Sequence, residues 1–168
     1  MRTRVAFRRQ FVAGRRSKAS GARTSEHSPC GYTSMPGPTV RREAEAVAAI
    51  LDMAQAGTFH LVRSPAHDFE NERNPRKDQP VATRLWLETA TVSVAASHPT
   101  ADRARALAAL GFAPLDALHL AFAEASAARW FVTTDDRLLK VALRHREQLR
   151  VDVVRPDQVP LGTAGDQS

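Results

Sequence analysis

The sequence lacks what several classes of protein require. It has a single cysteine, Cys30, which excludes an internal disulfide framework and a cysteine-rich zinc site. No apolar run approaches the roughly 18 residues of a membrane span, and the arginine-rich start has no apolar stretch typical of a secretory signal. No Gly-x-Gly-x-x-Gly follows a predicted strand, so a Rossmann-type nucleotide-binding domain ranks last among the candidate functions. We expect a cytoplasmic protein without a membrane partner.

Aromatic residues are scarce and positive charge is unevenly spread. Aromatic residues make up 6% of the chain and hydrophobic residues 43%, so we expect a core built mostly of Ala, Leu and Val. Residues 1–40 carry eight Lys or Arg and one acid, a net +7. The rest carries 16 basic and 17 acidic residues (24 − 8 and 18 − 1), a net −1. The length of 168 residues suggests one nearly neutral domain behind a basic segment.

Residues 1–40 contain no aspartate and no sustained apolar period. Three interpretations are open: a disordered basic arm that contacts nucleic acid, an organelle-targeting peptide, or a segment translated from a wrong start or reading frame. We favour the third, because recognisable motifs occur only after residue 41. The predicted organisation is a disordered or mis-translated segment over 1–40, a folded domain over 41–157 and a flexible tail over 158–168.

From residue 41, helical and strand-like patterns alternate. The clearest helix covers 40–56, with an apolar face and Gly57 at its end. Another is expected from a Thr100 cap through residue 110. The other predicted helices are 66–72, 80–90 and 136–144, and the predicted strands are 60–64, 91–97, 130–134 and 151–154. This alternation favours an α/β fold with a parallel sheet and helices on both of its faces.

The stretch 115–136, LDALHLAFAEASAARWFVTTDD, predicts a helix, a turn and a buried strand that ends in two carboxylates. Ligands of open α/β sheets bind outside the carboxyl ends of the strands. Asp135 stands at such an end, and Asp116 lies in the first turn of the preceding helix. The two acids could share a hard cation such as Mg²⁺ or Mn²⁺. In the structural alternative, Asp116 complements a helix dipole and Asp135 caps the next helix.

The order of these elements, with LDALHLA followed by FVTTDDRLL, resembles the PIN-domain family, including the VapC-type toxins of bacteria. The resemblance covers residues 41–157 and is strongest over 105–140. It implies a single three-layer α/β/α domain and a metal-dependent ribonuclease, with a cluster of acids at the carboxyl edge of the sheet. Asp116 and Asp135 match acids of that cluster, and Asp136 is an additional one.

An upstream acid, Glu70, completes the matched set. It lies six residues after Ser64 and resembles the family's acid after the second strand, within FENERNP, a segment similar to the F-E-x-x-R-N-P signature of one PIN subgroup. The family begins with a strand and an Asp in a V-x-L-D-T pattern, which we expect to be missing here. His119, three residues after Asp116, is interpreted as a core residue or a neighbour of the ligands rather than a ligand.

The resemblance leads to two functional hypotheses. The first is a Mg²⁺- or Mn²⁺-dependent endoribonuclease of PIN/VapC toxin type, impaired by the missing first Asp. In this hypothesis Glu70, Asp116 and Asp135 are the catalytic metal ligands, joined by Asp136. The alternative is a non-catalytic PIN-like module that binds RNA or a protein. By analogy with the family, the expected partners are an RNA substrate, a cognate antitoxin and a second copy of the chain.

Overall fold

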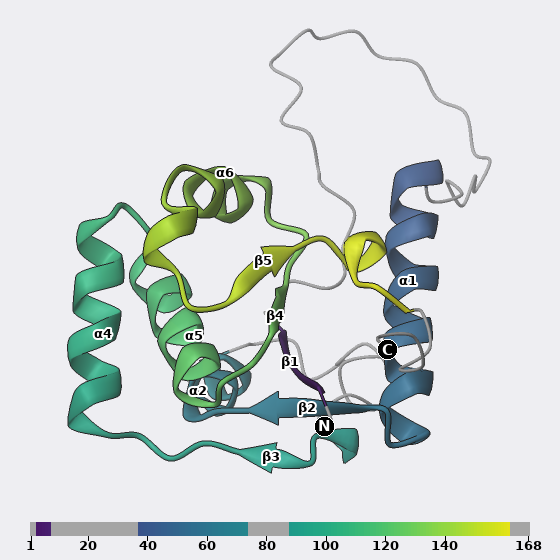
Figure 1. The fold of residues 1–168 in the computed structure, drawn as a ribbon, viewed down its shortest axis with the longest axis horizontal. Coiled ribbons are helices and arrows are strands. Elements are labelled where there is room, and N and C mark those ends of the chain that lie inside the picture. The colour runs from purple at the N-terminus through teal and green to yellow at the C-terminus, as the bar shows by residue number, and fades with distance from the viewer. Residues whose placement is uncertain (1–2, 8–36, 74–87, 162–168) are drawn as a thin grey trace, which may run out of the picture.

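A five-stranded sheet, in which every strand is parallel to its neighbours, forms the centre of the molecule (Figure 1). The computed structural model describes residues 3–7, 37–73 and 88–161. The strands, in their order across the sheet, are β3 (Val92–Ser93), β2 (Phe59–Arg63), β1 (Thr3–Phe7), β4 (Trp130–Val132) and β5 (Asp152–Val154). The predicted α/β fold with a central parallel sheet is confirmed.

The central strand, β1, comes from the segment that we expected to lie outside the domain. It pairs with β2 on one side and with β4 on the other, and Val5 lies opposite both Leu61 and Trp130. Its apolar residues are buried although arginines flank them. Three apolar residues are too few to predict a strand, but mid-sheet they are hydrogen-bonded on both sides and covered on both faces. The expectation that the first strand is missing was wrong. Of the rest of the expected arm, residues 38–40 belong to the first described helix, and residues 1–2 and 8–36 lie outside the described residues, as do residues 162–168 of the expected tail.

Proline occupies one of the first two positions of most of the described helices, where a residue without an N–H costs nothing. The helix α4 (His98–Ala109) begins earlier than predicted, since its cap is Ser97, whose Oγ accepts a hydrogen bond from the Thr100 N–H at 3.3 Å. The helix predicted at 80–90 lies mostly outside the described residues. The described helices are α1 (Pro38–Gln55), α2 (Pro65–Arg73), α4 (His98–Ala109), α5 (Pro114–Ala125) and α6 (Asp136–Arg144), with the 3-10 turns η1 (Arg146–Gln148) and η2 (Pro156–Gln158).

Alternate residues of β1 point to opposite faces of the sheet and enter two separate apolar cores. Ala6 belongs to a core shared with α4, α5 and α6, whereas Val5 and Phe7 belong to a core shared with α1. Helices therefore cover both faces, and Figure 1 shows α1 on one side with α4, α5 and α6 on the other. None of the described helices has the length and apolarity to cross a membrane.

The turn between α5 and β4 holds a non-glycine residue in the left-handed region, Ala127, with φ of 53°. Its N–H donates to the carbonyl of Glu124, and the N–H of Ala128 donates to the carbonyl of Ala123. These are the two hydrogen bonds of a Schellman motif. α1 ends in the same motif, where Gly57 takes the corresponding place with φ of 74°. The two turns differ in whether a Cβ is present at the left-handed residue.

Ala127→Gly is therefore expected to raise the free energy of unfolding by about 0.5–1 kcal/mol, because the relief of left-handed strain exceeds the entropy that glycine adds to the unfolded chain. Gly57→Ala is the matched reverse change. A Cβ at Gly57 would meet nothing within 4 Å, so only backbone conformation opposes it, and a loss of about 1 kcal/mol is expected. Urea unfolding of the two variants and the parent measures both effects. A loss of stability in Ala127→Gly would contradict this account of the turn.

Candidate active site at the carboxyl edge of the sheet

His67 joins the carboxyl ends of β1 and β2. It lies in the first turn of α2, and Ser64 alone separates α2 from β2. The His67 Nδ1 lies 3.0 Å from the backbone nitrogen of Ser64, and its Nε2 lies 2.7 Å from the carbonyl oxygen of Phe7. Because the Ser64 N–H can only donate, Nδ1 accepts and Nε2–H donates to Phe7. Neutral His67 thus holds α2 against the end of the central strand.

The environment of His67 disfavours its protonated form. Burial is the main reason that the pKa of His67 falls from 6.5 to about 4, and the neighbouring His119 lowers it further. The contacts with Phe7 and Ser64 and the charge of Glu70 act in the opposite direction but do not compensate. The imidazole is therefore neutral at pH 7 in the folded protein.

Because His67 is buried in its neutral form, we expect the free energy of unfolding to fall in mild acid. Because the pKa is lowered in the folded state, the contribution is complete above the unfolded value of 6.5 and is lost as the pH falls towards 4. The expected loss is on the order of 3 kcal/mol, at about 1.4 kcal/mol per pKa unit. His67→Gln, whose amide oxygen can accept the Ser64 N–H without titrating, should remove this part of the pH dependence.

The control is His98→Gln, at an exposed site in the first turn of α4, which should keep the pH dependence of the parent. Urea unfolding of all three proteins between about pH 4 and about pH 7 measures the difference. Carboxylates titrate in all three and cancel in the comparison. Equal pH dependence of His67→Gln and the parent would show that His67 does not carry the effect.

Glu70, one of the predicted ligands, reaches α5 through His119. The Oε2 of Glu70 lies 3.1 Å from the Nε2 of His119. His119 is buried, and its ring packs against the ring of His67 with centroids 4.6 Å apart. These contacts connect α2 to α5 at the end of β1. His119 is a core residue, as interpreted from the sequence, and it also holds a predicted ligand.

Asp116, the second predicted ligand, is a buried acid in the first turn of α5, with 6% of its surface exposed. α5 joins the start of β4 through a short turn, so its first turn lies towards the opposite, carboxyl edge of the sheet. His119, one turn further along α5, contacts His67, which is bonded to the end of β1. The α5 dipole favours a negative charge at this position. Asp116 therefore lies on the same side of the edge as Glu70.

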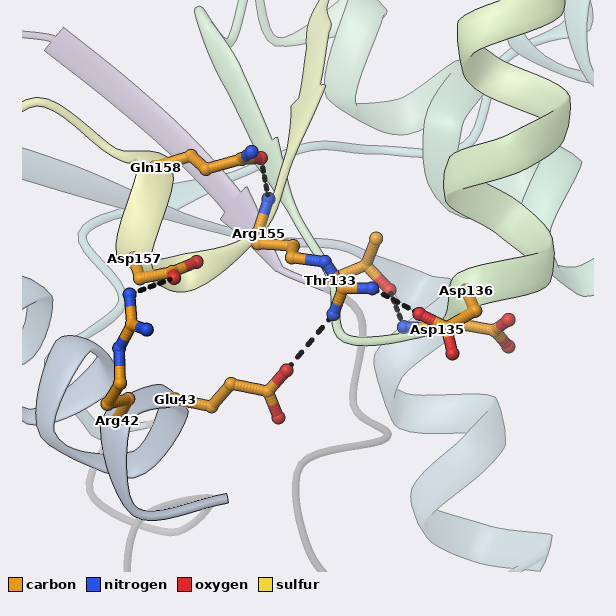
Figure 2. Close-up of polar contacts among 8 residues, drawn as sticks. All are labelled: Arg42, Glu43, Thr133, Asp135, Asp136, Arg155, Asp157 and Gln158. Atoms are coloured by element: carbon orange, nitrogen blue, oxygen red, sulfur yellow. Dashed lines mark hydrogen bonds and ion pairs between the residues drawn. The ribbon is translucent and has the colours of Figure 1, made fainter. Parts of the chain in front are cut away.

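Asp135, the third predicted ligand, follows β4 and caps α6 (Figure 2). Its Oδ1 accepts hydrogen bonds from the backbone N–H groups of Arg137 at 2.8 Å and Leu138 at 3.2 Å. The Oγ1 of buried Thr133 accepts the Asp135 N–H at 3.1 Å and helps to shape the end of the strand. The structural interpretation of Asp135 as a helix cap is confirmed. Both capping hydrogen bonds use one carboxylate oxygen, and they fix the orientation of the group.

Asp136, predicted as an additional ligand, pairs with a cation of the protein. In Figure 2 the Arg155 guanidinium lies between Asp136 of α6 and Glu43 of α1. The distance from the Arg155 Nη1 to the Glu43 Oε1 is 3.1 Å. A second ion pair, Arg42 with Asp157 at 3.2 Å, also joins α1 to η2. Asp136 therefore has a structural role, connecting α6 to α1 through Arg155.

The acids at this edge have the chemistry of a hard-cation site but do not form a closed one. Among residues 3–7, 37–73 and 88–161, no group of three or more His, Cys, Asp or Glu is arranged to hold a metal ion. Mg²⁺ commonly takes one or two protein carboxylates and completes its shell with water and substrate phosphates. The type of donor thus fits Mg²⁺ or Mn²⁺, with Glu70, Asp116 and Asp135 as the residues that would hold it.

Comparison of the chain with models of protein families, with curated proteins and with solved structures finds no match. Function is therefore inferred from the carboxyl edge of the sheet and from the sequence motifs. The resemblance to PIN domains stays a prediction.

Two residues of this edge, His67 and Arg155, were not singled out from the sequence. The spacing between Ser64 and His67 is a signal that could have identified His67. Ser64 precedes the helix and His67 is its third residue, the position from which the Glu or Gln of a capping box accepts the N–H of the cap residue. No local signal identifies Arg155, since its partners Glu43 and Asp136 are 112 and 19 positions away.

Proposed function

We propose that the chain is a divalent-cation-dependent endoribonuclease of PIN type whose active site is the carboxyl edge of the sheet. The observation that carries the proposal is the buried acid Asp116, which lies one helical turn from the His119 that contacts Glu70. Burying a carboxylate costs free energy, and buried ionisable groups of this kind are concentrated at functional sites. The carboxyl edge is also where open parallel sheets bind ligands.

In this proposal the carboxylates of the site come from three separate elements. Glu70 comes from α2, Asp116 from α5 and Asp135 from the loop after β4. Contact with His119 orients Glu70, and the capping hydrogen bonds orient Asp135, so neither side chain has to be ordered when a substrate arrives. A cation bound at these carboxylates would supply a water of lowered pKa and neutralise charge on an RNA phosphodiester.

A second candidate, a non-catalytic module that binds RNA or a protein, is favoured by the end of the central strand. β1 ends at Phe7, and the next residue in the sequence is Arg8, where the V-x-L-D pattern of PIN domains has an acid. An arginine there adds a positive charge where the nuclease needs a negative one. The cytoplasmic location, the homodimer and the antitoxin partner inferred from the resemblance belong to the proposal in either form.

Incubation of the purified chain with a mixed RNA pool, in Mg²⁺ or Mn²⁺ and with an EDTA control, tests the nuclease directly. We expect slow cleavage that EDTA abolishes, slow because the first acid is absent. RNA binding without any cation-dependent cleavage would favour the second candidate. Cleavage that is unaffected by EDTA would contradict the metal-dependent mechanism.

A further inference from the structure

The exposed face of α6 carries a stripe of positive charge formed by Arg137, Lys140 and Arg144. At 3.6 residues per turn these positions fall within an arc of about 60°. All three side chains are exposed, whereas Leu138 and Ala142, on the opposite side of the helix, are buried. The only acid of α6 is Asp136 in the first turn, which pairs with Arg155. The stripe is therefore cationic along its whole length.

The stripe gathers its cations on one helix face without an acidic partner among the described residues. Three exposed arginines elsewhere, Arg42, Arg63 and Arg105, each pair with an aspartate, whereas unpaired exposed arginines such as Arg41 and Arg129 lie outside this helix. Within the part of the chain that the structure describes, no acid forms an ion pair with Arg137, Lys140 or Arg144. An ordinary solvated helix face mixes charges, often as acid and base pairs four residues apart. A face that keeps only its cations is suited to a polyanion.

The position of the stripe connects it to the candidate active site. α6 begins directly after Asp135, so Arg137 lies in the turn that Asp135 caps. From there the stripe extends for about 10 Å along the helix, at 1.5 Å per residue. Lys140 also lines an open groove of about 610 Å³ between α6 and β5, together with Arg146 and apolar residues such as Leu139. Two acids, Asp136 and Asp152, line the same groove, and Asp136 pairs with Arg155. Phosphates that follow the stripe would leave bases room above this apolar lining.

We propose that the α6 stripe binds the phosphate backbone of single-stranded RNA and leads it to the carboxyl edge. The inference rests on the proposed function for the position of the bond that is cut, but the binding itself needs no metal. Lys and Arg that neutralise phosphates release counterions, and the logarithm of the binding constant then falls with the logarithm of salt concentration by about 0.7 per contact for single strands. Three contacts give a contribution of about 2 to this slope.

The test compares two triple variants with the same change in net charge. The first is Arg137→Gln with Lys140→Gln and Arg144→Gln. The control is Arg105→Gln with Arg129→Gln and Arg150→Gln, three exposed sites away from α6. Binding of a fluorescent oligouridine RNA is measured in EDTA at several salt concentrations. The α6 variant should show a slope shallower by about 2. Between about 50 and 200 mM salt, the fold-loss in affinity of the parent should therefore exceed that of the α6 variant by about twentyfold.

Equal slopes in the α6 variant and the control would overturn the inference, as would tighter binding of a DNA of the same sequence or binding of an acidic polypeptide in place of RNA. Arg137→Lys with Arg144→Lys should keep the parent slope, which separates loss of charge from loss of folding. RNA cleavage assayed on the same proteins separates the two proposals. A shallower salt slope in the α6 variant than in the control, without cation-dependent cleavage by the parent, would contradict the proposed function alone. Cation-dependent cleavage by the parent, with the same salt slope in the α6 variant and the control, would contradict the role of the α6 stripe alone.

Discussion

Asp116→Asn is expected to lower Mg²⁺- or Mn²⁺-dependent RNA cleavage by at least about a hundredfold. Asparagine keeps the shape of the side chain but removes one negative charge and one strong oxygen donor, and hard-cation affinity depends on both. Even neighbours of metal ligands change affinity or activity by about 10–100-fold when mutated, so a ligand should do more. Because Asp116 is buried at the start of α5, nearby groups cannot readily take its place.

The matched control is Asp52→Asn, an exposed acid near the end of α1 and therefore at the opposite edge of the sheet. It should cleave RNA at the parent rate. Thermal unfolding of both variants shows whether the fold is intact. Asp116→Asn should change the midpoint little, because the lost interaction with the α5 dipole opposes the relief of repulsion between the carboxylates of the proposed site. Parent-like cleavage by Asp116→Asn would exclude Asp116 from the site.

Arg8→Asp is expected to raise cation-dependent cleavage by on the order of a hundredfold. β1 ends at Phe7, and in the proposed alignment with the V-x-L-D pattern the next residue of the sequence, Arg8, corresponds to the Asp. Under the nuclease proposal, Arg8→Asp would change the charge near the bound dication by two units. At a separation of about 5 Å this is worth about 3 kcal/mol even with the dielectric constant of water. A more buried site would gain more.

Arg8→Asn is the control for this change, since it removes the cation without supplying a carboxylate. The nuclease proposal predicts a small gain for Asn and a large gain for Asp. Both variants are assayed on the same RNA pool, and Asp116→Asn is then added to Arg8→Asp and should remove the gain. Equal rates for Arg8→Asp and Arg8→Asn would mean that no carboxylate is needed at this position.

The layers of the fold could be predicted from the sequence because helices and buried strands have local periods. α1 follows its apolar period to within two residues of the prediction. The Asp135 cap was likewise foreseeable, as it depends on the next three residues alone. β1 was missed because its identity depends on β2 and β4, which begin more than fifty residues later and hold it on both sides.

The candidate site was foreseeable only in its acids. Glu70, Asp116 and Asp135 were selected from motifs, but the contacts that orient them cross the chain. His119 contacts Glu70, and His67 bonds to the end of a strand 60 positions earlier. No local pattern encodes such pairings, because they arise when α2 and α5 pack at the same end of the sheet. The structural role of Asp136 depends in the same way on Arg155.

Calorimetric titration of Mn²⁺ into the parent, Arg8→Asp, Asp116→Asn and Asp52→Asn tests for the cation site itself, because binding of the cation can be measured without the right RNA. We expect saturable Mn²⁺ binding in the parent and in Asp52→Asn, tighter binding in Arg8→Asp, and no binding in Asp116→Asn. Mn²⁺ binding that is the same in Asp116→Asn and the parent, or absent even from Arg8→Asp, would contradict this expectation.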